Sequence, residues 1–253
     1  MKNMLTVTLL SAFLITLAFA PDAAKMGVSF VEAAQAAGVR KVVYNSVYHP
    51  SLPLENHVST RPVEAALYAS ALDFTILQPA MYMQGLDGAF EQALRTGTLV
   101  MPWSKHSEMT YVDYRDVAEA AALAFTGERL SRGTFELAGP GMVDRIRLAE
   151  LMTTASGREV TAVDLPAGFT LPPGQPGGLS AMFVEYDQHG FHGGNSLVLR
   201  AIHLYGYLAQ RLDTRLGPPG VLSVSPTRNW WSLADGPTVW SRFQGDSSFI
   251  DAR

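Results

Sequence analysis

The amino-acid sequence predicts an α/β fold in which helices cover both faces of a parallel sheet. Between Gly27 and Leu86 an apolar strand follows an amphipathic helix twice in one run. This alternation is typical of βαβ units, which build parallel sheets. Hydrophobic residues make up 47% of the 253 residues and charged residues 17%, which permits a large core and excludes global disorder. The length suits one α/β domain with extra elements.

The first twenty residues allow more than one interpretation. A buried parallel strand over residues 10–20 fits the continuous apolar run, and Pro21 and Asp22 would open the next helix. A secretory signal fits Lys2, the apolar run and the small residues around position 20. A membrane-spanning helix is the third reading, although the run barely reaches the ~20 residues that a bilayer needs. We favour a central strand, because proline is a poor residue after a cleavage site and the next helix needs a preceding strand.

The next elements follow from periodicity and from turn residues. Helix 22–37 places Met26 and Phe30 on one face with several alanines, and Gly38 suits its left-handed cap. Strand 41–47 is rich in β-branched residues, and a polar loop with two prolines covers 48–60. Thr60 is expected to cap helix 62–70. Strand 73–78 then ends before Pro79.

The second half of the chain continues the alternation with shorter elements. The expected helices are 90–95, 116–125, 145–155, 181–189 and 196–207, and the expected extended segments are 98–101, 109–112, 133–137 and 158–163. Residues 166–178 hold four prolines and four glycines, which predicts a loop. From about 217 onward periodicity fades, and we expect a poorly ordered tail. The predicted division is a core over 10–165, substrate-side helices over 166–216 and an irregular tail over 217–253.

Charge and cysteine content exclude some classes of function. The net charge is −4 and no basic block is present, so a nucleic-acid partner is not expected. Cysteine is absent, which excludes disulfides, thiol catalysis and cysteine-bound metal. No GxSxG, HExxH or Walker motif occurs.

Three clusters suggest chemistry but are better explained structurally. Gly139-Pro-Gly141 follows a strand as a phosphate loop would, yet Asp144 stands at the third glycine position and favours a plain turn. His189 and His192 lack a third ligand at a convincing spacing, which favours a glycine-rich turn. The run 111–116 contains two aspartates around an arginine; a capped helix start, with Asp113 or Asp116 as the cap, explains it.

The ends of the central strands carry the stronger functional signal. In open α/β sheets, ligands bind outside the carboxyl ends of the strands. Ser46 and Val47 end one predicted strand, and Pro79 and Ala80 follow another. Arg61 lies in the loop and helix start near them and brings a permanent positive charge. We therefore predict a ligand site at this edge.

Several phrases resemble the NmrA-like group of atypical short-chain dehydrogenases. They are FVEAAQAAGVRKVVYNSV, RPVEAALYASALDFTILQPAMYMQ, YVDYRDVAEAAALAF and GTFELAGPGMVDRIRLAELM, within a resembling region of residues 12–202. The resemblance implies a Rossmann-like fold that binds NAD(P), with Ser46, Val47, Arg61, Pro79 and Ala80 near the nicotinamide end. It also implies an NAD(P)-dependent oxidoreductase acting on a small carbonyl or quinone-like substrate. A non-catalytic dinucleotide-sensing regulator and an inert fragment are the alternatives.

The sequence departs from this family at both ends. Family members begin with a strand and a GxxGxxG turn, which the sequence lacks, and the Tyr-x-x-x-Lys pair of classical reductases is also absent. The fold expected is therefore a partial, truncated Rossmann-like sheet with a small C-terminal substrate-side region, in which NAD(P) binding is weakened or lost. The expected partners are a small-molecule substrate or dinucleotide, without membrane or nucleic acid. The expected location is cytoplasmic, or extracellular if residues 1–20 are a signal.

Overall fold

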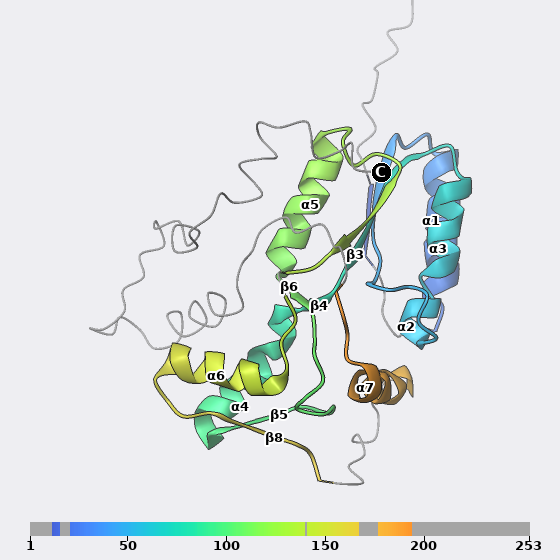
Figure 1. The fold of residues 1–253 in the computed structure, drawn as a ribbon. Helices are drawn as coiled ribbons and strands as arrows, with labels where there is room; N and C mark the ends of the chain where they lie inside the picture. Colours follow the sequence, from blue (N-terminus) through green and yellow to red (C-terminus); the bar gives the residue numbers. More distant parts are fainter. Residues whose placement is uncertain (1–11, 16–20, 140, 167–176, 194–253) are drawn as a thin grey trace, which may run out of the picture. The chain divides into compact units, whose positions relative to one another are not determined.

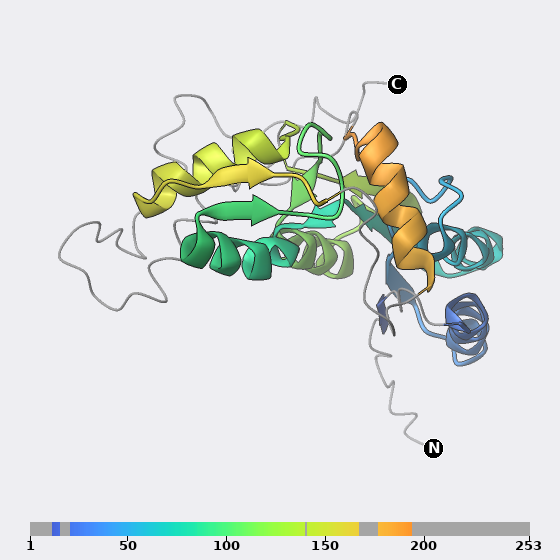
Figure 2. The ribbon, with the colours of Figure 1, turned by 90° about the horizontal axis from the view of Figure 1, so that it is seen from below.

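A computed structural model describes residues 12–15, 21–139, 141–166 and 177–193, which form two compact units (Figures 1 and 2). Within these residues, the first unit comprises 12–15, 21–80, 117–137 and 177–182. The second comprises 81–116, 138–139, 141–166 and 183–193. In the described part of the chain, no helix is both long and apolar enough to cross a bilayer.

The first unit is built on a four-stranded parallel sheet, as the sequence predicts. Its order is β1-β2-β3-β7, with β1 at Ala12–Ile15, β2 at Lys41–Asn45, β3 at Asp73–Pro79 and β7 at Gly133–Leu137. Strands β2 and β3 are almost entirely buried, which explains their continuous apolar composition. Every described strand in this sheet runs in the same direction, and the α/β class is confirmed.

Helices cover both faces of this sheet (Figure 1). Those of the first unit are α1 at Ala23–Ala36, α2 at Glu55–Val58, α3 at Arg61–Ala69 and most of α5, which runs over Tyr114–Thr126. Helices α1 and α3 lie on one face and α5 on the other. Gly38, in the left-handed conformation with φ 70°, ends the turn after α1 as predicted.

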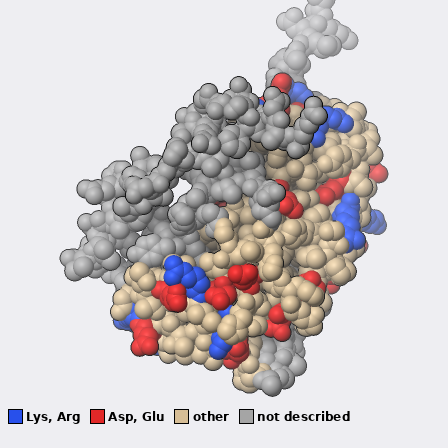
Figure 3. Space-filling model, in the orientation of Figure 1, with Lys and Arg blue, Asp and Glu red and all other residues tan. Residues whose placement is uncertain are grey.

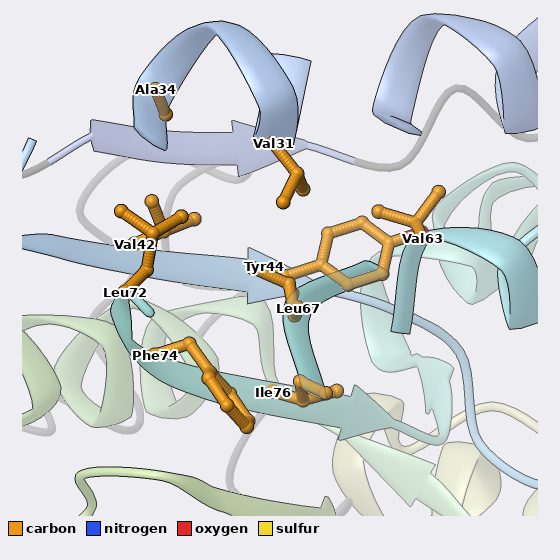
Figure 4. Packing of buried hydrophobic residues seen from close by; sticks show 9 residues of the cluster. All are labelled: Val31, Ala34, Val42, Tyr44, Val63, Leu67, Leu72, Phe74 and Ile76. Carbon is orange, nitrogen blue, oxygen red and sulfur yellow. The ribbon is translucent and has the colours of Figure 1, made fainter. Parts of the chain in front are cut away.

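The main core lies between the sheet and the pair α1 and α3 (Figure 4). Side chains from alternate positions of β2 and β3 meet apolar residues of both helices and of the turn before β3. The buried cluster consists of Val31, Ala34, Val42, Tyr44, Val63, Leu67, Leu72, Phe74 and Ile76. The two helices approach so closely that a Cβ atom on Gly27 would collide with Val63. Gly27 is therefore required by packing rather than by backbone conformation.

On the other face of the sheet, a buried lysine connects the strands to α5. Lys41, 3% exposed at the start of β2, donates to the carbonyls of Ala124 at 2.8 Å and Gly127 at 2.6 Å. These carbonyls lie at the C-terminal end of α5, where a cation also interacts favourably with the helix dipole. Asp73 Oδ2, at 3.1 Å, supplies the compensating charge. The contacts join β2, β3 and α5.

The second unit contains two small parallel sheets and their helices. Its strands are β4 at Met81–Tyr82, β6 at Tyr111–Val112, β5 at Thr98–Val100 and β8 at Thr161–Val163, paired β4-β6 and β5-β8; its helices are a 3-10 turn η1 at Met83–Leu86, α4 at Asp87–Thr96 and α6 at Arg145–Ser156. Buried Arg145 donates to the carbonyls of Met101, Trp103 and Val163. Helix α7, at Gly177–His189, has residues in both units.

Several sequence predictions are corrected by the structure. Thr60 occupies the N-cap position of α3 as predicted, but its side chain makes no capping bond, because its hydroxyl donates to the His57 carbonyl at 2.8 Å. The predicted loop 48–60 contains helix α2, and α7 begins four residues before the predicted position 181. Strand β1 lies at an edge of the described sheet rather than at its centre, since among the described strands only β2 pairs with it.

Some predictions fall on residues that the structure leaves out. Helix 196–207 and the tail 217–253 lie outside the described residues, as do 10–11 and 16–20 of the predicted first strand. The division into 10–165, 166–216 and 217–253 stays a prediction, because 167–176 and 194–253 are not described.

Candidate functional site

The carboxyl ends of three strands of the first unit meet at one edge. Gln78 of β3 lies in register with Glu136 of β7. Pairing continues past β2, where the Ser46 amide donates to the Leu77 carbonyl at 2.7 Å. Two further backbone bonds extend it: Tyr48 N–H to Pro79 O at 3.1 Å and Ala80 N–H to Leu137 O at 2.9 Å. Of the predicted site residues, Ser46, Pro79 and Ala80 are thus fixed along this edge, and Val47, half-buried, lies between Ser46 and Tyr48.

A carboxylate from α3 joins two of the strand ends. Glu64 Oε1 accepts a hydrogen bond from the Ser46 hydroxyl at 2.5 Å and another from Gln78 Nε2 at 2.9 Å. Ser46 and Gln78 are 4% and 5% exposed, whereas Glu64 is half-buried. Among the described residues, no cation lies within ion-pair distance of this carboxylate. The edge therefore holds a negative charge stabilised by neutral donors.

Two histidines lie in the segment after β2. His49 adopts a left-handed backbone with φ 51°, and its Nδ1 lies 3.3 Å from Glu136 Oε1. The His49 carbonyl is 2.9 Å from Nδ1 of His57, which is fully buried. Burial, first of all, lowers the pKa of His57 below its usual 6.5, and positive charge at His49 and Arg61 lowers it further, against backbone hydrogen bonds that raise it.

Arg61 is exposed, and its guanidinium is engaged locally. It donates to the backbone carbonyls of Pro50 at 2.6 Å, Ser51 at 2.7 Å and Leu52 at 2.8 Å. These bonds hold the loop after β2 against the start of α3. The structure thus places Arg61 beside the loop of the predicted site, while Ser46 bonds to Glu64 rather than to Arg61.

Charge decides which class of ligand group this edge suits. The two carboxylates, Glu64 and Glu136, would repel a diphosphate, whereas the neutral amide and hydroxyl groups of Gln78 and Ser46 suit uncharged groups that form hydrogen bonds. On the face of the molecule shown in Figure 3, acidic and basic side chains are interspersed. Among the described residues, the edge therefore suits uncharged hydrogen-bonding groups better than a diphosphate.

The three other clusters form structural contacts. Asp113, at the start of α5, accepts from the Arg115 amide at 2.8 Å and pairs with its guanidinium, as the capping interpretation predicts. Burial works to raise the pKa of Asp113, but the bonds and charge of Arg115 outweigh it and hold that pKa below its usual value. Asp144 caps α6 by accepting from the Arg147 amide at 2.7 Å. Its carboxylate therefore lies where a phosphate would bind. His189 pairs with Glu185, 3.2 Å away.

Sequence reasoning missed Glu64 as part of the edge. Its spacing from Arg61 could have indicated it. Glu64 follows Arg61 by three residues, and residues three apart on a helix share a face. His49 and Glu136 were missed because the pairing of β3 with β7 across the chain is not visible in the sequence.

Comparisons with known proteins agree with this architecture. The model of the NmrA-like family matches residues 6–210. Photosystem II assembly factor Ycf39 of Synechocystis is 29% identical over 137 residues, which are 51% of this chain and 41% of the relative. Quinone oxidoreductase 2 of Escherichia coli is 29% identical over 174 residues, 65% of this chain and 59% of the relative.

A solved structure supports the same fold. Triphenylmethane reductase of Citrobacter, complexed with NADP(H), superposes with a TM-score of 0.70 at 17% identity, over 80% of this chain and 76% of that chain. This comparison shows the fold alone. The chain spans about half the length of the curated relatives it matches.

Proposed function

The chain belongs to the NmrA-like family, and from this premise we propose that it is an NAD(P)-dependent oxidoreductase. The proposed acceptor is a small carbonyl or quinone-like compound. A quinone oxidoreductase and an NAD(P)H azoreductase among the relatives support this class of reaction. When bound, the dinucleotide would supply the hydride.

The observation that carries the proposal is the polar edge formed by the ends of β2, β3 and β7. Ser46, Val47, Pro79 and Ala80 would border the nicotinamide end, at the place where parallel sheets of this class bind ligands. The backbone bonds along the edge fix these residues before any ligand arrives, which lowers the entropic cost of binding. Arg61 would contribute by holding the loop after β2 in place.

Isotope-labelled cofactor tests the proposed reaction. The protein is supplied with millimolar NADPH and a water-soluble 1,4-quinone, and NADPH oxidation is followed with each of the two C4-deuterated diastereomers. Enzymatic hydride transfer is expected to slow with one diastereomer only, because a fixed nicotinamide presents one face to the acceptor. Ser46→Ala should lower the rate, and Glu32→Gln, an exposed change on α1, should leave it unchanged.

The contrary outcomes are distinct. Dinucleotide binding without any NADPH oxidation, across quinone and carbonyl acceptors, would favour a dinucleotide-sensing regulator. Absence of binding at millimolar concentration would show that the chain retains the fold without the function.

A further inference from the structure

The hydrogen-bond polarity around Glu64 determines what the edge can bind. A carboxylate oxygen only accepts hydrogen bonds. Because Ser46 donates its single hydroxyl proton to Glu64, the Ser46 oxygen keeps only lone pairs for a further partner. Because Gln78 turns its amide nitrogen toward the same oxygen, its carbonyl oxygen lies on the other side of the amide group. One carboxylate thus sets the orientation of two neighbouring side chains.

We propose that Glu64 is a positioning residue that turns Ser46 and Gln78 into a pair of hydrogen-bond acceptors, which select an uncharged ligand group carrying N–H or O–H donors. The inference rests on the proposed function and specifies which chemical group the edge recognises. In a nicotinamide dinucleotide that group is the carboxamide NH₂.

Charge and burial point in the same direction. Ser46 and Gln78 are both more than nine-tenths buried, so water competes little with a ligand donor for their acceptor oxygens. The Glu64 carboxylate has no cation partner among the described residues and would repel a phosphate or a carboxylate placed nearby. An oxyanion is therefore disfavoured beside Ser46, and a neutral donor is preferred.

A pair of dinucleotides that differ in one group tests the proposal. NADP⁺ carries the carboxamide, whereas its 3-acetylpyridine analogue replaces the NH₂ group with a methyl group and has no N–H donor. The parent protein is expected to bind NADP⁺ about tenfold more tightly than the analogue, the effect of one hydrogen bond to a buried acceptor. The ratio of the two dissociation constants, measured by titration calorimetry, is independent of the shared diphosphate and adenosine.

The variants should change this ratio and not merely the affinity. Glu64→Gln lets the new amide donate to Ser46 and frees the hydroxyl to turn, so the ratio should fall toward one. Ser46→Ala and Gln78→Leu each remove one acceptor and should reduce it separately, which keeps the test valid if one variant misfolds. Glu32→Gln removes the same charge from an exposed position of α1 and should leave the ratio unchanged.

Two results would overturn the proposal in different ways. Equal affinity of the parent for both dinucleotides, or an unchanged ratio in all three variants, overturns the inference while the proposed function stands. Failure of both dinucleotides to bind the parent overturns the proposed function and the inference with it.

Discussion

At the scale of single residues, His57 couples stability to pH. Its pKa in the folded protein is lowered, first by burial, so the unfolded chain takes up a proton below about pH 6.5 that the folded protein does not. The contribution of neutral His57 to the free energy of unfolding should therefore be fully present above pH 6.5. It should decrease as the pH falls from 6.5 toward the lowered pKa of His57 in the folded protein. The contribution is at most about 1.4 kcal/mol per pH unit for one proton.

Denaturant unfolding at several pH values checks this expectation. His57→Gln should flatten the decline between pH 6.5 and pH 5, whatever it does to stability at neutral pH. His106→Gln, which changes an exposed histidine, should keep the parent slope. Parallel curves for the parent and His57→Gln would show that other groups cause the pH dependence.

At the scale of elements, the α1–α3 contact depends on one glycine. A methyl group at position 27 would collide with Val63, so Gly27→Ala should destabilise the protein by about 1–3 kcal/mol despite the better helix propensity of alanine. Gly88→Ala is the matched control, since Gly88 lies in α4 with open space around it, and it should be neutral or stabilising.

A double-mutant cycle tests whether the contact with Val63 causes the destabilisation by Gly27→Ala. In a Val63→Ala background the obstructing methyl groups are gone, so Gly27→Ala should lose most of its cost. Additive free energies of unfolding for the two changes would show that the contact with Val63 is not responsible.

At the scale of the whole molecule, the 253-residue polypeptide should bind NADPH weakly. The glycine-rich turn is absent from its sequence, Asp144 caps α6 at the one turn resembling it, and the strand-end edge carries two carboxylates. Each charge-assisted hydrogen bond lost to the diphosphate is worth about 1.5–3 kcal/mol, and about 1.4 kcal/mol is tenfold in affinity. A millimolar dissociation constant is expected by calorimetry. A micromolar value would indicate a substitute phosphate site in the polypeptide.

The sequence by itself determined the class of fold, because buried parallel strands need continuous apolar runs and crossover helices need an apolar stripe, and both are local patterns. Strand β7 was predicted with its observed bounds, and Gly38 as a left-handed cap, for this reason. Local patterns do not show which of several nearby backbone groups a polar side chain will bond to. Thr60 was therefore expected to cap α3, whereas its hydroxyl bonds within the preceding turn.

Only the tertiary structure decided the composition of the candidate site. Ser46, Glu64 and Gln78 come from three elements, and their hydrogen bonds exist because the parallel pairing of β2 with β3 and the packing of α3 bring them to one edge. The sequence places residues along a chain, but the polarity of a site depends on which donors meet which acceptors across elements. That polarity arises from packing, which leads Ser46, predicted as a site residue from its position alone, to donate its hydroxyl proton to Glu64.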